Sequence, residues 1–175
     1  MIGSDRAPRR PRPVTASYLD RAALYYLGRY ASSAENLRRV LLRKVKRRLL
    51  PDEVLGPDLE ALVGDTVERA LRTGLLDDRT YAEARTASLM RRGTSPRGIR
   101  ARLRDKGVGA DAITAAIDEA APDELALARR LAERRRFGPW RSPGRPAAPE
   151  KELAALCRAG FSPRIARAAL ADPDE

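Results

Sequence analysis

Two segments of this chain carry closely spaced arginine and lysine residues whose side chains are suited to binding phosphate. The basic side chains are Arg38, Arg39, Arg43 and Lys44 in the first segment and Arg97, Arg100, Arg104 and Lys106 in the second. Guanidinium groups form paired hydrogen bonds with phosphate oxygens, and ammonium groups attract them as point charges. Few acidic residues stand four positions away to neutralise these charges. The two rows are therefore candidate contacts to a polyanion; the alternative is an ordinary solvated helix face.

The residue types that most catalysis and metal binding require are scarce. The chain contains no histidine and one cysteine, Cys157, so it cannot assemble a zinc site or a Cys–His nucleophile. The stretch Gly107-Val-Gly109 follows a basic helix and no strand, which indicates a helix end rather than a nucleotide-binding loop. Asp77 and Asp78 are better explained as helix-capping residues than as a carboxylate pair. We expect neither an enzyme nor a cofactor.

The basic rows lie in segments that repeat. Ser33 to Lys44 and Ser95 to Lys106 both begin with a capping serine, continue with apolar residues four apart, and end in lysine. A weaker third copy around Leu156 to Leu170 follows the same pattern. Repetition of one small amphipathic unit, with almost no alternating β-branched residues, predicts an all-α fold. We expect a tandem array of three three-helix modules resembling helix-turn-helix repeats, elongated and curved.

Proline, glycine and the apolar periodicity predict the boundaries of these modules. Residues 1–13 read as a disordered basic arm. Modules follow at 14–74, 75–121 and 122–173, and the third contains a proline-rich loop at 137–149. In the first module, Ser32 and Glu35 match a capping box. In the second, Tyr81, Ala84, Ser88 and Leu89 are expected to face inward.

The charge of +11 is distributed unevenly. Residues 1–50 contain 13 basic and 3 acidic side chains, residues 51–90 contain 4 and 9, and residues 91–110 contain 7 and 1. Basic charge that returns with the repeat favours basic ridges on one side of the stack. No apolar run approaches the length of a membrane span, no signal-peptide pattern opens the chain, and a lone cysteine excludes an intrachain disulfide. We expect a cytoplasmic protein with no membrane association.

A helix-turn-helix reader of DNA bases is a further alternative. The segment from Ser95 to Ala120 has the required helix–glycine–helix pattern. Its second helix, however, carries Asp111, Asp118 and Glu119, which would meet DNA phosphates unfavourably. Arg29, Arg91 and Arg92 are additional candidate contacts, unless their stems only cover hydrophobic seams.

The order of these motifs along residues 17–171 resembles the RecX family, bacterial regulators of the RecA recombinase. The matching stretches are Ser32 to Leu41 behind a first helix reaching Arg29, Gly74 to Asp78 followed by Tyr81-Ala82, Gly93 to Val108, and Leu156 to Phe161. The prolines around Trp140 depart from the pattern as a lengthened loop.

The resemblance implies a protein that binds the helical groove of the RecA–DNA filament, blocks filament growth or speeds disassembly, and suppresses ATP hydrolysis, strand exchange and co-protease activity. Its partners would be the filament and the phosphates of single- and double-stranded DNA. We expect a monomer, although the sequence itself does not fix the oligomeric state or which module dominates affinity. A DNA-binding protein acting without recombinase, and a scaffold that binds neither, stay open as alternatives. Filament capping and filament disassembly need the same surface, so the sequence does not separate them.

Overall fold

The computed structural model describes residues 13–50, 53–144 and 146–171 of the 175-residue chain. Within these ranges the chain forms nine α-helices and one short 3₁₀ helix, and no strand. The all-α fold class predicted from the repeat is therefore confirmed. Most of the predicted basic arm (residues 1–12), Pro51 and the last residues of the predicted third module lie outside the described ranges.

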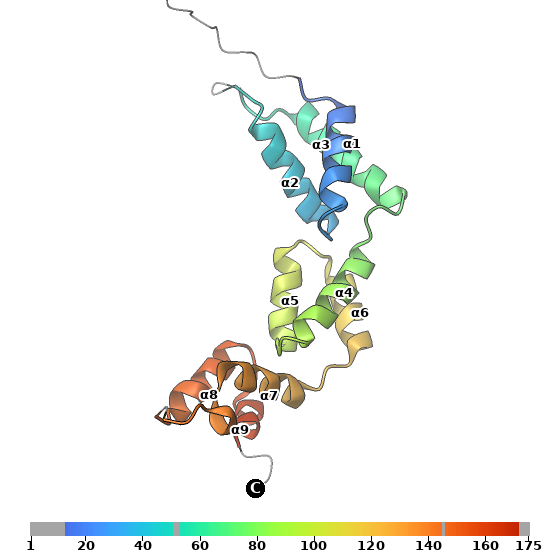
Figure 1. Ribbon diagram of the computed structural model, residues 1–175. Coiled ribbons are helices and arrows are strands. Elements are labelled where there is room, and N and C mark those ends of the chain that lie inside the picture. The colour runs from blue at the N-terminus through green and yellow to red at the C-terminus, as the bar shows by residue number, and fades with distance from the viewer. Residues whose placement is uncertain (1–12, 51–52, 145, 172–175) are drawn as a thin grey trace, which may run out of the picture. The chain divides into compact units, whose positions relative to one another are not determined.

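The chain divides into two compact units, and the boundary in the sequence lies between Asp77 and Asp78. Unit 1 contains α1 (Ala16–Leu27), α2 (Ala34–Lys46) and α3 (Pro57–Arg72), packed as one trio (Figure 1). Its core consists of apolar side chains spaced three or four residues apart on each helix, among them Leu19, Leu41 and Val63, all fully buried. Helical periodicity thus gives each helix one buried face, as the sequence predicts.

The ends of the unit 1 helices follow from local chemistry, with one correction. The capping residue of α2 is Ser33, whose hydroxyl accepts a hydrogen bond from the Asn36 amide at 3.2 Å. The predicted Ser32–Glu35 capping box is wrong, because the helix begins one residue later. Ser32 instead accepts a hydrogen bond from the Asn36 side chain at 2.8 Å. The α3 helix ends at Arg72, and Gly74 just beyond it is left-handed (φ 70°), a conformation that other residues adopt at a cost.

Unit 2 begins with a second trio: α4 (Asp78–Met90), α5 (Pro96–Asp105) and α6 (Ala110–Ala120). The buried residues of α4 are Ala82, Thr86 and Leu89. Of the inward face predicted for α4, Leu89 is buried, Tyr81 is half-buried against the core of the trio and Ser88 is half-buried, whereas Ala84 is exposed and was predicted wrongly. This helix is weakly amphipathic, so small residues on both faces leave the periodicity ambiguous.

A third trio completes unit 2 with α7 (Glu124–Arg135), α8 (Pro149–Arg158) and α9 (Pro163–Leu170). The predicted proline-rich loop lies between α7 and α8 and includes a 3₁₀ turn at Gly138–Trp140. A buried carboxylate holds this loop: Glu152 of α8 accepts a hydrogen bond from the Gly138 amide at 2.9 Å and pairs with Arg141 at 2.8 Å.

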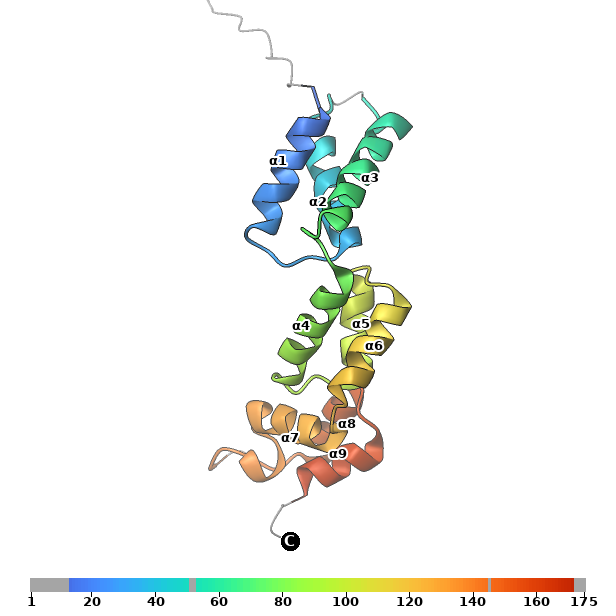
Figure 2. The same cartoon turned by 90° about the vertical axis from the view of Figure 1, so that its right-hand side faces the viewer.

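The two trios of unit 2 meet through close backbone contacts at the N-terminal end of α5 (Figure 2). The Ser95 hydroxyl donates to the carbonyl of Ala159, at the end of α8, at 2.6 Å. A side chain at Gly93 would lie 2.6 Å from the Leu131 nitrogen of α7. Met90 packs against the apolar clusters of both trios. These contacts explain why six helices behave as one compact unit.

Candidate polyanion-binding surface

The α5 helix presents three arginines on one face. Arg97, Arg100 and Arg104 follow a spacing of three and four residues, which places side chains in a row along a helix. Within the described ranges, no acidic side chain forms an ion pair with any of the three, and no hydrogen bond occupies their guanidinium groups. Arg97 and Arg104 are exposed and Arg100 is half-buried, and the donors of all three are available to an anion.

The sequence of α5 fixes the direction of this row. Ser95 caps the helix by accepting from the Gly98 amide at 3.0 Å, and Pro96 occupies the first turn. Ile99 and Leu103 are fully buried, so the three arginines of the row must lie on the sides and outer face of the helix. Gly107, with φ of 74°, follows the end of the helix, while Lys106 is its exposed C-terminal capping residue.

The basic residues of α2 do not form one row. Arg39 and Arg43 share the exposed face, four residues apart, while Arg38 and Lys44 flank the buried stripe on opposite sides and are half-buried. Glu35 pairs with Arg39 at 2.9 Å and reaches Arg38 at 3.9 Å. Two of the four predicted contacts on α2 therefore already have an acidic neighbour.

The offset of 62 residues between the two repeats also limits their correspondence. When Ser33 is matched to Ser95, only Arg38 with Arg100 and Lys44 with Lys106 are basic at equivalent positions. Arg39 corresponds to Ala101 and Arg43 to Asp105. The repeat thus matches caps and buried residues closely, and basic side chains only in part.

The additional candidates Arg29, Arg91 and Arg92 lie in different environments. The Arg29 guanidinium stacks over the Tyr25 ring, 3.9 Å from its centroid, so an aromatic partner holds it. Arg91 and Arg92 follow the end of α4 and are exposed. Arg91 lies beside Glu83 and Glu119, whereas Arg92 lies at a second concentration of arginines.

This second concentration lines a hollow of about 380 Å³ between α5, α7 and α8 in unit 2. Its arginines are Arg92, Arg102, Arg134, Arg135 and Arg158. Only Arg92 was a candidate from the sequence. The run Arg134-Arg135-Arg136 gave a signal for two more, but Arg102 and Arg158 are single residues on separate helices and only the packing of the two trios brings them together.

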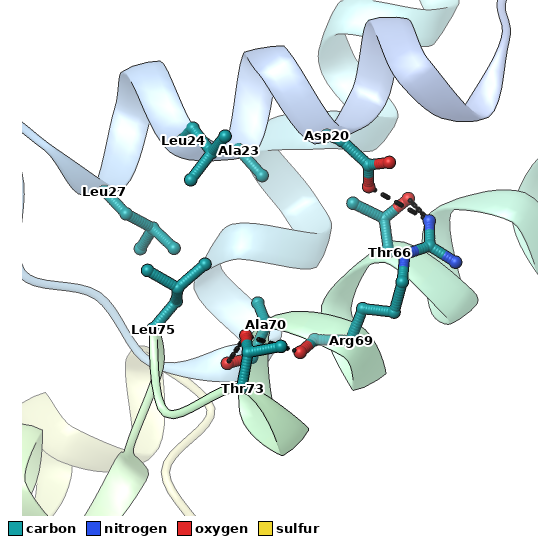
Figure 3. A pocket seen from close by; sticks show the side chains of 9 residues that line it. All are labelled: Asp20, Ala23, Leu24, Leu27, Thr66, Arg69, Ala70, Thr73 and Leu75. Atoms are coloured by element: carbon teal, nitrogen blue, oxygen red, sulfur yellow. Dashed lines mark hydrogen bonds and ion pairs between the residues drawn. The ribbon is translucent and has the colours of Figure 1, made fainter.

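Unit 1 has a different hollow, apolar and about 220 Å³ in volume, between α1 and α3. Figure 3 shows Leu24 and Leu27 of α1 opposite Leu75, with Asp20 and Arg69 paired at one end. The Asp20–Arg69 distance is 3.0 Å. The lining of this hollow is mostly apolar, and its one arginine is already paired with Asp20, so the hollow does not suit an anion.

The described residues were compared with the requirements of a metal site and of a membrane-spanning helix. No group of three or more histidine, cysteine, aspartate and glutamate side chains there is placed to hold a metal ion. Along the same ranges, no helix combines the length and the apolar character needed to cross a bilayer. The fold and these surfaces define a helical-repeat protein with exposed, uncompensated arginines.

Comparison of the sequence with known proteins identifies the family of this chain. Residues 77–117 match the family model described as RecX, second three-helix domain. The chain is 41% identical over 167 residues to Regulatory protein RecX of Myxococcus xanthus (strain DK1622), covering 93% of this chain and 89% of that protein. It is 34% identical over 152 residues to Regulatory protein RecX of Agrobacterium fabrum (strain C58 / ATCC 33970), covering 83% and 78%. The chain belongs to the RecX family of regulatory proteins.

Solved structures agree on the fold. The crystal structure of RecX from Lactobacillus salivarius superposes with a TM-score of 0.64 at 20% identity, covering 89% of this chain and 94% of that one. Another crystal structure of regulatory protein RecX gives 0.62 at 21% identity, covering 87% and 70%. The resemblance to the family drawn from the sequence is confirmed.

Proposed function

We propose that this protein is a negative modulator of the RecA recombinase, which binds the groove of the recombinase–DNA filament and suppresses ATP hydrolysis, strand exchange and filament extension. Membership of a family of regulatory proteins supports a regulatory role. The filament is a regular polyanion-bearing assembly, and a protein with several helical modules can touch it at several points. Contacts that are weak singly become strong together through effective concentration.

The observation that carries this proposal is the α5 row. Arg97, Arg100 and Arg104 present unoccupied guanidinium donors in one line on a rigid, capped helix. A line of donors suits the regular phosphates of a nucleic acid, and their fixed placement lowers the entropy that binding costs. On α2, Arg43 is an exposed basic side chain that could add a contact, whereas Arg39 is already paired with Glu35.

The protein acts in this proposal by binding, without catalysis of its own and without a cofactor. A regulator of this kind favours one state of the filament over another in proportion to its difference in affinity for the two. We propose that it does so as a cytoplasmic monomer built of modules 14–74, 75–121 and 122–173.

Charge reversal on α5 tests the proposal. The triple variant Arg97→Glu, Arg100→Glu and Arg104→Glu should lose at least tenfold in inhibition of DNA-dependent ATP hydrolysis by the recombinase. A matched control reverses Arg72, Arg164 and Arg167, exposed arginines outside the row, and should keep its inhibition within about twofold. Circular dichroism checks that both variants fold. Full inhibition by the folded α5 variant would overturn the proposal.

The second candidate is a DNA-binding protein that acts without recombinase, which the same arginine row favours. The exposed Asp111, Asp118 and Glu119 on α6 argue against reading bases with that helix, so binding would be through phosphates. Titrating the protein against bare and recombinase-coated DNA at several salt concentrations separates the candidates. Tight binding to bare duplex, with a logarithmic salt slope that falls by about 0.9 for each arginine removed, would favour the second.

A further inference from the structure

The hollow between α5, α7 and α8 collects positive charge from three helices. Arg102 comes from α5, Arg134 and Arg135 from α7, and Arg158 from α8. No acidic residue is among the residues that line it. Like charges around one hollow repel, and the fold tolerates them most easily where an anion can enter.

The helix dipole explains why each of these arginines stands at the end of its helix. It does not explain why the arginines of three helices line the same hollow. Arg102, Arg134 and Arg158 each stand in the last turn of their helix, where a cation is favoured by the negative helix end. An arginine in the last turn would satisfy that preference whichever side of the helix its side chain pointed to. Here the docking of two trios turns all three helix ends toward one hollow.

Two of the guanidinium groups have donors to spare. Within the described residues, Arg102 and Arg158 make no side-chain hydrogen bond and no ion pair. Arg134 is held in place because it donates to the backbone carbonyl of Arg92. A guanidinium carries five N–H donors in a planar fork, so Arg134 also keeps donors for a second acceptor.

This hollow is distinct from the α5 row. Arg102 follows Arg100 by two residues and precedes Arg104 by two, and residues two apart point to different sides of a helix. Gly98, which lines the hollow with Arg102, lies on the side of α5 facing Ala159 of the third trio. None of Arg97, Arg100 and Arg104 is among the residues that line the hollow.

We propose that this hollow is a phosphate-binding site in which Arg102 and Arg158 provide paired hydrogen bonds and Arg134 and Arg135 provide additional charge. A volume of about 380 Å³ is many times the roughly 10–15 Å³ that one water needs by the same measure, so a phosphate or pyrophosphate group fits. Planar guanidinium groups match the geometry of phosphate oxygens, which makes this chemistry the best fit to the lining.

A phosphate bound here bridges the two trios of unit 2. Arg102 belongs to the trio α4–α6 and Arg158 to the trio α7–α9, so one anion in contact with both adds a link beside the Ser95–Ala159 hydrogen bond. Binding to the folded state alone raises stability with ligand concentration. The melting temperature should therefore rise with phosphate.

The test uses the full chain, inorganic pyrophosphate as the probe, and constant ionic strength, without recombinase. Calorimetric titration gives the affinity of the native protein and of the variant Arg102→Gln/Arg158→Gln. The control Arg164→Gln/Arg167→Gln removes the same charge from exposed positions on α9 that do not line the hollow. We expect at least a tenfold loss of affinity in the first variant and less than twofold in the control. The site would be overturned by equal losses of affinity in the two variants. It would also be overturned if the native protein bound no pyrophosphate in a buffer whose ionic strength is held constant with chloride.

Competition assigns the source of the phosphate. A single-stranded oligonucleotide that displaces pyrophosphate identifies a nucleic-acid backbone as the ligand, and one that binds alongside it identifies a free phosphate compound. Both results support a phosphate site. Because this titration contains no recombinase, a failed site leaves the proposed regulation untouched, and a failed ATPase test leaves the site untouched.

Discussion

The helices α2 and α5 share a sequence pattern but differ in what surrounds their first turn. Both begin with a fully buried serine, Ser33 or Ser95, that accepts from an amide three residues on. Near Ser33, the Asn36 side chain donates to Tyr26 at 3.0 Å and to Ser32 at 2.8 Å, all within unit 1. Ser95 instead donates across to Ala159 of another trio.

The residue three positions after each serine also differs between the two helices. Asn36 in α2 corresponds to Gly98 in α5, where a Cβ atom would lie 3.0 Å from Thr94 and 3.6 Å from the Ala159 carbonyl. Asn36 thus binds within its own trio, whereas at Gly98 the Ala159 carbonyl of the next trio lies beside the helix end. The repeated cap thus closes the first turn of both helices, while Ser95 also links its trio to the neighbouring trio of unit 2.

The two units also treat ion pairs differently. The Asp20–Arg69 pair of unit 1 is roughly two-fifths exposed on both sides, at 44% and 39%. The Arg141–Glu152 pair of unit 2 is 22% and 5% exposed, and its carboxylate accepts from a backbone amide as well. Removing a partner matters little where water can replace it and much where it cannot.

The largest expected effect is at the joint of unit 2, from Gly93→Ala. Gly93 has φ of 68°, and its Cβ would lie 2.6 Å from the Leu131 nitrogen and 2.7 Å from the Leu127 carbonyl oxygen. Backbone strain and overpacking together should cost about 4 kcal/mol of unfolding free energy. Urea denaturation measures the loss, and hydrogen exchange should place it in α4–α9. Gly144→Ala, with φ of 80° and open space, should cost only about 1 kcal/mol; equal costs at the two sites would refute the close contact.

Glu152→Gln should have the next largest effect. It leaves Arg141 without its carboxylate partner in a mostly buried setting, at a cost of about 3 kcal/mol. Asp20→Asn is the matched change in unit 1 and should cost about 0.5 kcal/mol. Thermal denaturation of both variants checks the ratio. A loss from Asp20→Asn as large as that from Glu152→Gln would show that exposure does not govern these pairs.

The serine caps provide the most direct comparison of α2 and α5. Ser33→Ala removes one cap hydrogen bond, worth about 1 kcal/mol. Ser95→Ala removes a cap and the bond to Ala159, and should cost about 2 kcal/mol. Denaturant titration of each variant gives the two values. If Ser95→Ala were no more destabilising than Ser33→Ala, the link between the trios would carry no free energy.

The smallest effect is a gain in stability. Thr86 on α4 is fully buried, and within the described residues its hydroxyl has no hydrogen-bond partner. Thr86→Val should therefore stabilise unit 2 by about 1 kcal/mol. Thr66 on α3 is also buried, but its hydroxyl donates to the Leu62 carbonyl at 2.9 Å, so Thr66→Val should destabilise by about 1 kcal/mol. Melting temperatures should move in opposite directions, and a loss of stability from Thr86→Val would contradict the missing partner.

The sequence by itself determined the helical fold, because caps, glycine ends and three- and four-residue apolar spacing act within one helix. Ser95, Gly74 and Gly107 behave as their local chemistry requires. At the start of α2 the local signals were ambiguous, because Ser33 begins the repeat while Ser32 matches a capping box, and the structure has Ser33 as the cap.

Tertiary structure decided which arginines meet. Helical spacing is enough to align Arg97, Arg100 and Arg104, since all three stand on one helix. Arg102 and Arg158 are 56 residues apart, and nothing local relates their directions. They face one hollow because Gly93 and Gly160 lack side chains that would collide with the opposite trio, a relation between distant residues that no single stretch of sequence encodes.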